Sequence, residues 1–147
     1  MNKAKAFTLI ELMVVILIVA ILAAVVAPLL LGRIHESKWS EAKAAAGSVA
    51  TALRAYWSEN EGSKNANVLG SCTTAADFEK IGLTAADLDG KYFELACYST
   101  SALTTSNPGT DTAAPQYTIT VTASSSSKAG HPSGTLTLNH LGVWTGP

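Results

Sequence analysis

Residues 7–31 read FTLIELMVVILIVAILAAVVAPLLL, and this stretch decides the fold. Its part from Leu12 to Leu31 contains 20 consecutive residues without a charge. A helix of that length is about 30 Å long, which matches the hydrocarbon core of a bilayer. Because the run has no polar stripe, such a helix is apolar on every side, as a lipid-embedded or fully packed helix is. The sequence therefore predicts a membrane-spanning helix, with Glu11 at its start and Pro28 near its end, where a kink or a local opening is expected.

Outside this stretch the composition is that of an ordinary polar globule. The 147 residues are 48% hydrophobic and 14% charged, with 10 Lys plus Arg against 11 Asp plus Glu and a net charge of -1. An apolar segment joined to a polar globule explains the high hydrophobic fraction and argues against a purely cytosolic protein. A near-neutral chain with no dense block of Lys or Arg has no electrostatic footprint for nucleic acid.

A short basic head, residues 1–6 with Lys3 and Lys5, precedes the apolar run. By the positive-inside rule this head stays in the cytoplasm, so the rest of the chain is expected outside. A cleaved secretory signal would share the head, but its apolar core is only about 7–15 residues long. A cut after Ala27 would also place Pro28 directly after the scissile bond. Removal of a simple signal peptide is therefore disfavoured.

The junction between the head and the run reads KAFTLIELMVV, residues 5–15. It resembles the N-terminal signature of type IV prepilins and of the related pseudopilins of type II secretion, in which a short basic leader precedes Phe-Thr-Leu-Ile-Glu and a long apolar stretch. The resemblance implies that a membrane-embedded prepilin peptidase cuts between Ala6 and Phe7 and then methylates the new amine of Phe7. The family usually has Gly before the cut, and Ala6 keeps a small side chain there.

Glu11 and Pro28 are the two residues of the run for which the resemblance implies a role in assembly. A carboxylate in the bilayer core costs about 2.5–3.5 kcal/mol on insertion scales, so Glu11 either needs a partner or lies among the headgroups at the interface. The resemblance implies that it pairs with the terminal amine of a neighbouring subunit and sets the register of assembly. For Pro28 the resemblance implies local melting of the helix, whereas a simple kink is the alternative.

The helix is expected to continue into the aqueous phase, where residues 33–62 form an amphipathic half that stops at Gly62. Apolar residues there recur at intervals of 3 and 4, which is typical of one buried helix face. The predicted organisation is a leader at 1–6, a transmembrane and filament-core helix at 7–32, this amphipathic half, and a globular β-sheet region at 63–147. The residues of the predicted face are Trp39, Ala42, Ala46, Val49, Leu53 and Tyr56.

The globular region contains three candidate strands, at residues 91–98, 116–123 and 134–139, each with alternating apolar positions. Two short helices are expected after Thr74 and Thr84, since each threonine is followed three residues later by an aspartate. The strands predict a small antiparallel meander whose apolar face covers the Ala-rich helix. The predicted fold class is α+β and pilin-like, with one long N-terminal helix packed on a small antiparallel sheet of three to four strands.

Cys72 and Cys97 are the two cysteines of the chain. Outside the cytoplasm such a pair is typical of a disulfide, here one between the connecting loop and the first candidate strand. Closing a loop of about 25 residues contributes roughly 3–4 kcal/mol on the chain-entropy model. A metal site is the weaker interpretation, because zinc sites need four ligands at close spacing.

No motif indicates catalysis, a cofactor or a metal. The three histidines lack His-Glu-x-x-His spacing, and neither a Gly-x-Ser-x-Gly elbow nor a phosphate-binding loop occurs. The main pseudopilins of type II secretion, as a family, carry a calcium site in their C-terminal loops, and calcium requires six to eight oxygen ligands. Residues 112–147 contain no Asp or Glu, which favours a type IV pilin over a pseudopilin.

The expected function is that of a structural filament subunit and not of an enzyme. The resemblance implies a single-pass inner-membrane protein that is processed by prepilin peptidase and assembled by the pilus machinery. It then self-associates into a helical filament on the cell surface, of an adhesion, motility or DNA-uptake type. Two alternatives stay open: a type II secretion pseudopilin, and a single-pass anchored periplasmic binding module that never polymerises.

Overall fold

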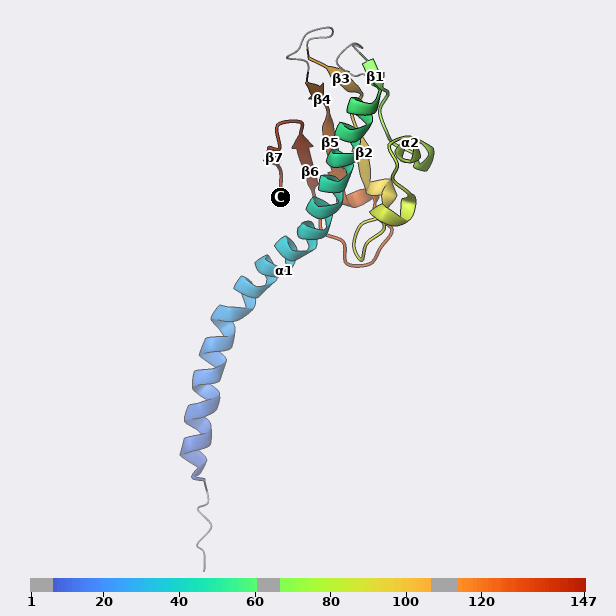
Figure 1. The fold of residues 1–147 in the computed structure, drawn as a ribbon. Coiled ribbons are helices and arrows are strands. Elements are labelled where there is room, and N and C mark those ends of the chain that lie inside the picture. The colour runs from blue at the N-terminus through green and yellow to red at the C-terminus, as the bar shows by residue number, and fades with distance from the viewer. Residues whose placement is uncertain (1–6, 61–66, 107–113) are drawn as a thin grey trace, which may run out of the picture. The chain divides into compact units, whose positions relative to one another are not determined.

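The computed structural model describes residues 7–60, 67–106 and 114–147. The chain divides into two units, with the boundary between Glu36 and Ser37. Unit 1 contains the beginning of helix α1 (Leu9–Glu59), and unit 2 contains the rest of that helix and all of the strands (Figure 1). The predicted leader, residues 1–6, and the predicted helix stop at Gly62 lie outside the described residues.

Helix α1 has 51 residues, which confirms the prediction of one long helix that continues past the apolar run. Within unit 2 it buries the face that its periodicity predicts, except that Tyr56 is only half-buried and Ala50 joins the face. Three of these buried residues are Ala, so elements that pack on the helix can approach its backbone closely. The buried residues of α1 are Trp39, Ala42, Ala46, Val49, Ala50 and Leu53.

Two antiparallel sheets accompany this part of the helix. The larger sheet has the strand order β2-β5-β6-β7, and the smaller one has the order β1-β3-β4. The strands are β1 (Asn67–Leu69), β2 (Tyr98–Thr100), β3 (Leu103–Thr105), β4 (Pro115–Gln116), β5 (Thr118–Thr122), β6 (Thr135–Asn139) and β7 (Trp144–Thr145). The predicted α+β architecture is confirmed, and the second sheet was not expected.

The pair β5–β6 shows why the alternating pattern predicted strands there. Ile119 lies opposite Leu138, and Val121 lies opposite Leu136. All four side chains are buried, while the intervening threonines are half-buried or exposed. Since side chains of a strand point alternately to its two faces, one face of this pair belongs to the core.

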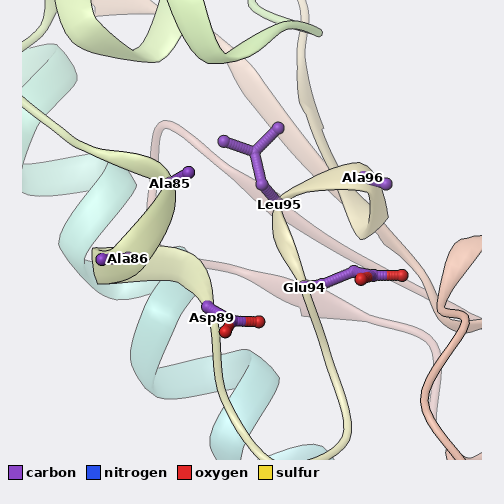
Figure 2. Close-up of a pocket in the computed structure, with 6 residues that line it drawn as sticks. All are labelled: Ala85, Ala86, Asp89, Glu94, Leu95 and Ala96. Atoms are coloured by element: carbon purple, nitrogen blue, oxygen red, sulfur yellow. The ribbon is translucent and has the colours of Figure 1, made fainter.

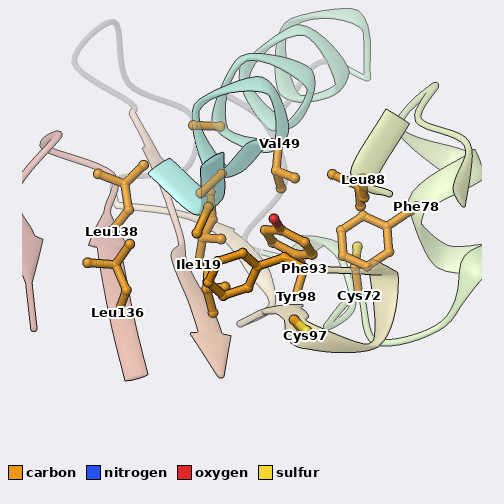
Figure 3. Close-up of a cluster of buried hydrophobic side chains, with 14 of the residues drawn as sticks. Val49, Cys72, Phe78, Leu88, Phe93, Cys97, Tyr98, Ile119, Leu136 and Leu138 are labelled. Carbon is orange, nitrogen blue, oxygen red and sulfur yellow. The ribbon is translucent and has the colours of Figure 1, made fainter. Parts of the chain in front are cut away.

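The core of unit 2 joins these strands to α1 and to the connecting region (Figure 3). Its centre is aromatic: the ring of Phe93 lies 5.2 Å from that of Trp39 and 6.5 Å from that of Tyr98, centroid to centroid. These tilted arrangements are ones that aromatic pairs prefer. On the other side Phe78 and Leu88 are fully buried and bring the connecting region into the same core.

The connecting region contains helix α2 (Ala75–Lys80) and two short 3₁₀ helices, η1 (Ala85–Leu88) and η2 (Leu95–Cys97). A third 3₁₀ turn, η3 (Ala123–Ser125), follows β5. Both α2 and η1 begin with a capping box, formed by Thr74 with Asp77 and by Thr84 with Asp87. The two predicted helix starts are therefore confirmed.

The strand predicted at residues 91–98 is wrong for most of its length. Residues 91–94 form no strand, η2 follows them, and β2 begins only at Tyr98. The physical reason is that the backbone N–H groups of Tyr92 and Phe93 donate to the Glu41 carboxylate of α1, at 2.9 and 3.0 Å, and not to a neighbouring strand. An alternating pattern indicates that every second side chain is buried, and a loop hydrogen-bonded to a helix can have the same burial pattern as a strand.

Candidate functional site

Thr8 and Glu11 form a capping box at the start of α1. One carboxylate oxygen of Glu11, Oε2, accepts hydrogen bonds from the backbone N–H of Thr8 at 2.9 Å and from its hydroxyl at 2.8 Å. In return the backbone N–H of Glu11 donates to Thr8 Oγ1 at 3.3 Å. This reciprocal pattern satisfies donors at the helix N-terminus and places a negative charge at the positive end of the helix dipole.

The sequence analysis singled out Glu11 but missed Thr8. The signal was present, because Thr8-Leu9-Ile10-Glu11 has the Thr-x-x-Glu spacing of a capping box directly before an apolar run. The structure fixes one oxygen of Glu11 by this box, and Oε1 makes no hydrogen bond to another described residue. That oxygen can accept a hydrogen bond from a donor that arrives from outside the chain.

Phe7 lies immediately before the box and is 80% exposed. Ala6, on the other side of the predicted cleavage point, lies outside the described residues. A cut between the two would place a new α-ammonium at Phe7, directly before the N-cap Thr8 and four residues before Glu11. The predicted roles of Ala6 and Phe7 in cleavage, and of Phe7 in methylation, stay predictions.

Every described side chain of unit 1 is exposed, including its whole apolar run. Its large apolar residues from Phe7 to Ile34 are between 44% and 80% exposed. Among the described residues, α1 is the one helix that is long and apolar enough to cross a membrane. A helix that is apolar on all sides and unburied by its own chain requires lipid or other helices around it.

Helix α1 is continuous through Pro28. Proline has no backbone N–H, so the carbonyl of Ala24 lacks its usual intrahelical donor. The predicted kink or melting at Pro28 stays a prediction, and this missing hydrogen bond is its physical basis.

Cys72 and Cys97 are both buried, and the structure describes both as free thiols. Cys72 pairs with β2 through its backbone: its N–H donates to the Thr100 hydroxyl at 3.1 Å, and its carbonyl accepts from the Thr100 N–H at 2.9 Å. Burial raises the pKa of the Cys72 thiol above its ordinary value. The predicted disulfide stays a prediction.

A small hollow of about 270 Å³ lies between η1 and η2 (Figure 2). Both of its carboxylates already have partners: Asp89 forms an ion pair with the Lys128 ammonium, and Glu94 accepts the backbone N–H of Ser127 at 2.6 Å. The hydrogen bond from Ser127 lowers the pKa of Glu94. Both carboxylates therefore serve contacts within the protein, and the rest of the lining is apolar. Its lining residues are Ala85, Ala86, Asp89, Glu94, Leu95 and Ala96.

The pseudopilin type of calcium site does not fit the described part of the C-terminal region. Residues 114–147 contain no carboxylate side chain. The Lys128 ammonium of this region contacts both the Asp89 carboxylate and the Gly90 carbonyl. Within the described residues no group of three or more His, Cys, Asp or Glu side chains could hold a metal ion.

Comparison with known families identifies a motif at the N-terminal end of the chain. Residues 1–27 match the family described as the prokaryotic N-terminal methylation motif, the prepilin signature of type IV pilins and pseudopilins. No curated protein and no solved structure matches the chain. The matched residues include the Thr8–Glu11 capping box and most of the exposed apolar run of unit 1.

Proposed function

We propose that this protein is the structural subunit of a type IV pilus, a filament of the adhesion, motility or DNA-uptake type. It is made as a prepilin, cut by prepilin peptidase between Ala6 and Phe7, and methylated at the amine of Phe7. Residues 7–32 hold it in the inner membrane before the assembly machinery packs it into a helical filament at the cell surface. The observation that supports this most is the fully exposed apolar helix with a carboxylate fixed at its beginning.

The exposed helix must be covered by apolar surroundings at every stage of assembly. In lipid, helices gain little from hydrophobic association because the lipid tails are as apolar as the side chains. Outside the membrane the same surface must be covered, at about 25 cal/mol for each Å² of apolar area removed from water. A filament core made of such helices covers it, so extraction from the membrane and polymerisation become one step.

Glu11 supplies register more than affinity. Its oxygen Oε2 accepts two hydrogen bonds from Thr8, which fix the orientation of the carboxylate and so the position of Oε1. The methylated α-ammonium of Phe7 in a second subunit is the donor that we assign to it. A charge-assisted hydrogen bond of this kind contributes about 1.5–3 kcal/mol, which distinguishes one register from its neighbours.

The pseudopilin alternative shares the N-terminal motif and differs in the filament that is built. The absence of carboxylates from residues 114–147 speaks against it. The anchored-module alternative requires that the leader stays on and that unit 1 remains in lipid. The Phe-Thr-Leu-Ile-Glu motif speaks against it, since a plain anchor has no need for a carboxylate at that depth in the bilayer.

Processing and export are tested by the mass and N-terminal sequence of the protein recovered from cells and from sheared surface material. We expect a chain that starts at Phe7 and is about 14 Da heavier than the bare sequence, because one methyl group has been added. Its presence in the sheared fraction indicates a surface filament. A chain that starts at Met1 and stays in the membrane fraction supports the anchored module.

The register role is tested with Glu11→Gln and Glu11→Ala. Both variants are expected to insert into the membrane and to give no filaments, since neither carries the charge that pairs with an ammonium. Met13→Ala is the matched control, because it removes an exposed apolar side chain of the same helix turn and leaves the carboxylate in place. Normal filaments from Glu11→Ala would contradict the register role.

A further inference from the structure

Unit 2 exposes one group of large apolar side chains. Leu141 is 74% exposed, Val143 is 53% exposed and Trp144 is 38% exposed. The other large apolar side chains described in unit 2 are buried or half-buried. We call these three residues the β6–β7 tip, since they lie in and directly after the turn that joins β6 to β7 (Figure 1). Exposed apolar side chains gathered in one place mark an interaction surface.

Side-chain and backbone hydrogen bonds close the turn that carries the tip. The side-chain oxygen of Asn139 accepts hydrogen bonds from the backbone N–H groups of Leu141 at 3.0 Å and of Val143 at 2.9 Å. The backbone closes the same turn, with Asn139 N–H donating to the Val143 carbonyl and Gly142 N–H donating to the Asn139 carbonyl. Gly142 has a φ of 82°, which glycine adopts without strain. The apolar side chains are therefore held outward by the fold.

The base of the turn is fixed to two other elements. The backbone N–H of His140 donates to the carbonyl of Tyr117, just before β5, at 3.0 Å. The guanidinium of Arg54 in α1 donates to the His140 carbonyl at 3.3 Å and lies 5.8 Å from the centroid of the Tyr117 ring. A surface held in this way loses little conformational entropy when a partner covers it.

The size of the tip restricts its partner. At the exposed fractions given above, the three side chains offer on the order of 300 Å² of surface. A specific interface between two proteins in solution needs about 800 Å² from each partner. The tip alone is too small to hold a partner that arrives from solution. It suits a neighbour that is already held nearby by another contact, because tethering raises the effective concentration to the millimolar range.

We propose that the β6–β7 tip contacts a second copy of this chain in the assembled filament. This inference rests on the proposed function, in which the helices of unit 1 supply the tether. Neighbouring copies then meet through different surfaces, the tip of one against another face of the next, and such a contact repeats along a filament without closing into a ring. The tip adds to filament strength, while processing and membrane insertion do not depend on it.

The first test is the reactivity of a thiol placed on the tip. Leu141→Cys is labelled with a maleimide in detergent-dispersed subunits and in intact filaments, and the unaltered chain, whose two cysteines are buried, gives the background. We expect labelling to be at least about tenfold slower in filaments, because the neighbour covers the site. Equal labelling rates in the two states overturn the inference and indicate that the tip faces the surroundings.

The second test is the strength of the filament. The double variant Leu141→Ser with Val143→Ser is compared with the matched control Leu141→Met with Val143→Ile, which keeps the tip apolar. The serine variant is expected to be cut and methylated normally, to keep the melting temperature of the subunit, and to lose filaments several-fold on shearing. Filaments as strong as those of the control overturn this inference alone. If the unaltered chain forms no filaments, the proposed function fails and this inference fails with it.

Discussion

Glu41 is predicted to hold the connecting region of unit 2 against helix α1. Its Oε1 atom accepts the backbone N–H groups of Tyr92 at 2.9 Å and of Phe93 at 3.0 Å. The ring of Phe93 then packs in the centre of the core, 5.2 Å from Trp39. The perturbation is Glu41→Ala, which removes the acceptor and leaves two donors without their partner.

The magnitude follows from these two contacts. A hydrogen bond to a charged group contributes about 1.5–3 kcal/mol, and contributions of neighbouring bonds to one oxygen are not additive. Glu41 is only half-buried, so water replaces part of what is lost. We expect Glu41→Ala to lower the free energy of unfolding by about 2–3 kcal/mol and Glu41→Gln, which keeps a neutral acceptor, by about 1 kcal/mol. For a domain of about 100 residues 1 kcal/mol shifts the melting temperature by roughly 4 °C, so the alanine variant should melt about 8–12 °C lower.

The assay is thermal unfolding of the full chain in detergent, followed by near-ultraviolet circular dichroism, which reports the packing of Trp39 and its aromatic neighbours. The matched control is Glu36→Ala, the same change on an exposed turn of the same helix, with an expected effect within about 0.5 kcal/mol. Gly90 supplies a second comparison, because a Cβ at this position would overlap the Glu41 carboxylate. Gly90→Ala should therefore destabilise the protein alone and much less in the Glu41→Ala background. Equal melting temperatures for Glu41→Ala and Glu36→Ala would refute the reasoning.

Two further predictions concern acid stability and the cysteines. The pKa of Asp77 is lowered by its hydrogen bonds, first with Lys80 and then with Thr74, so its contribution to stability is complete above the unfolded-state pKa of about 4 and is lost as the pH falls through the lower folded-state value. The melting temperature should thus be constant between pH 5 and 8 and fall below about pH 4. In Asp77→Asn the fall below pH 4 should be less steep. An equally steep fall in that variant speaks against the role of Asp77. Protein exported from cells should carry no free thiol when denatured without reductant, because the two cysteines of a chain that folds outside the cytoplasm are expected to form a disulfide. Two thiols per chain in that measurement would contradict the disulfide, and with the disulfide present Cys72→Ser and Cys97→Ser should each cost about 3 kcal/mol.

The fold was predictable where one periodic pattern decided the structure. The face of α1 follows from residues at intervals of 3 and 4, and β5 and β6 follow from apolar side chains at every second position. The short helices follow from Thr74 and Thr84, whose capping boxes are local in sequence. These are cases in which the chain's local preferences and its tertiary burial agree.

The strands that the sequence did not reveal are short and depend on distant partners. β1, β3 and β4 have two or three residues each, too few for a period to be recognised. β7 has two exposed residues and exists because the Asn139 turn returns the chain to β6. The wrong strand at 91–98 has the same origin, since the hydrogen bonds of that segment go to Glu41, about 50 residues away in the chain.

The sequence predicted which residues form the N-terminal site but not how the Glu11 carboxylate is hydrogen-bonded there. A carboxylate in the bilayer costs about 2.5–3.5 kcal/mol, and hydrogen-bond donors beside it reduce that cost while the subunit is in the membrane. Thr8 does this with two donors on a single oxygen of Glu11, at 2.9 and 2.8 Å, using groups that the helix start supplies in any case. Because both donors lie on the same oxygen, the other stays available, so a subunit in lipid keeps the acceptor that the proposed assembly requires. Thr8→Ala should therefore weaken assembly less than Glu11→Ala, since the charge remains and only its positioning is lost. Assembly defects of equal size in the two variants would mean that the box itself, and not the free oxygen, is what the neighbouring subunit recognises.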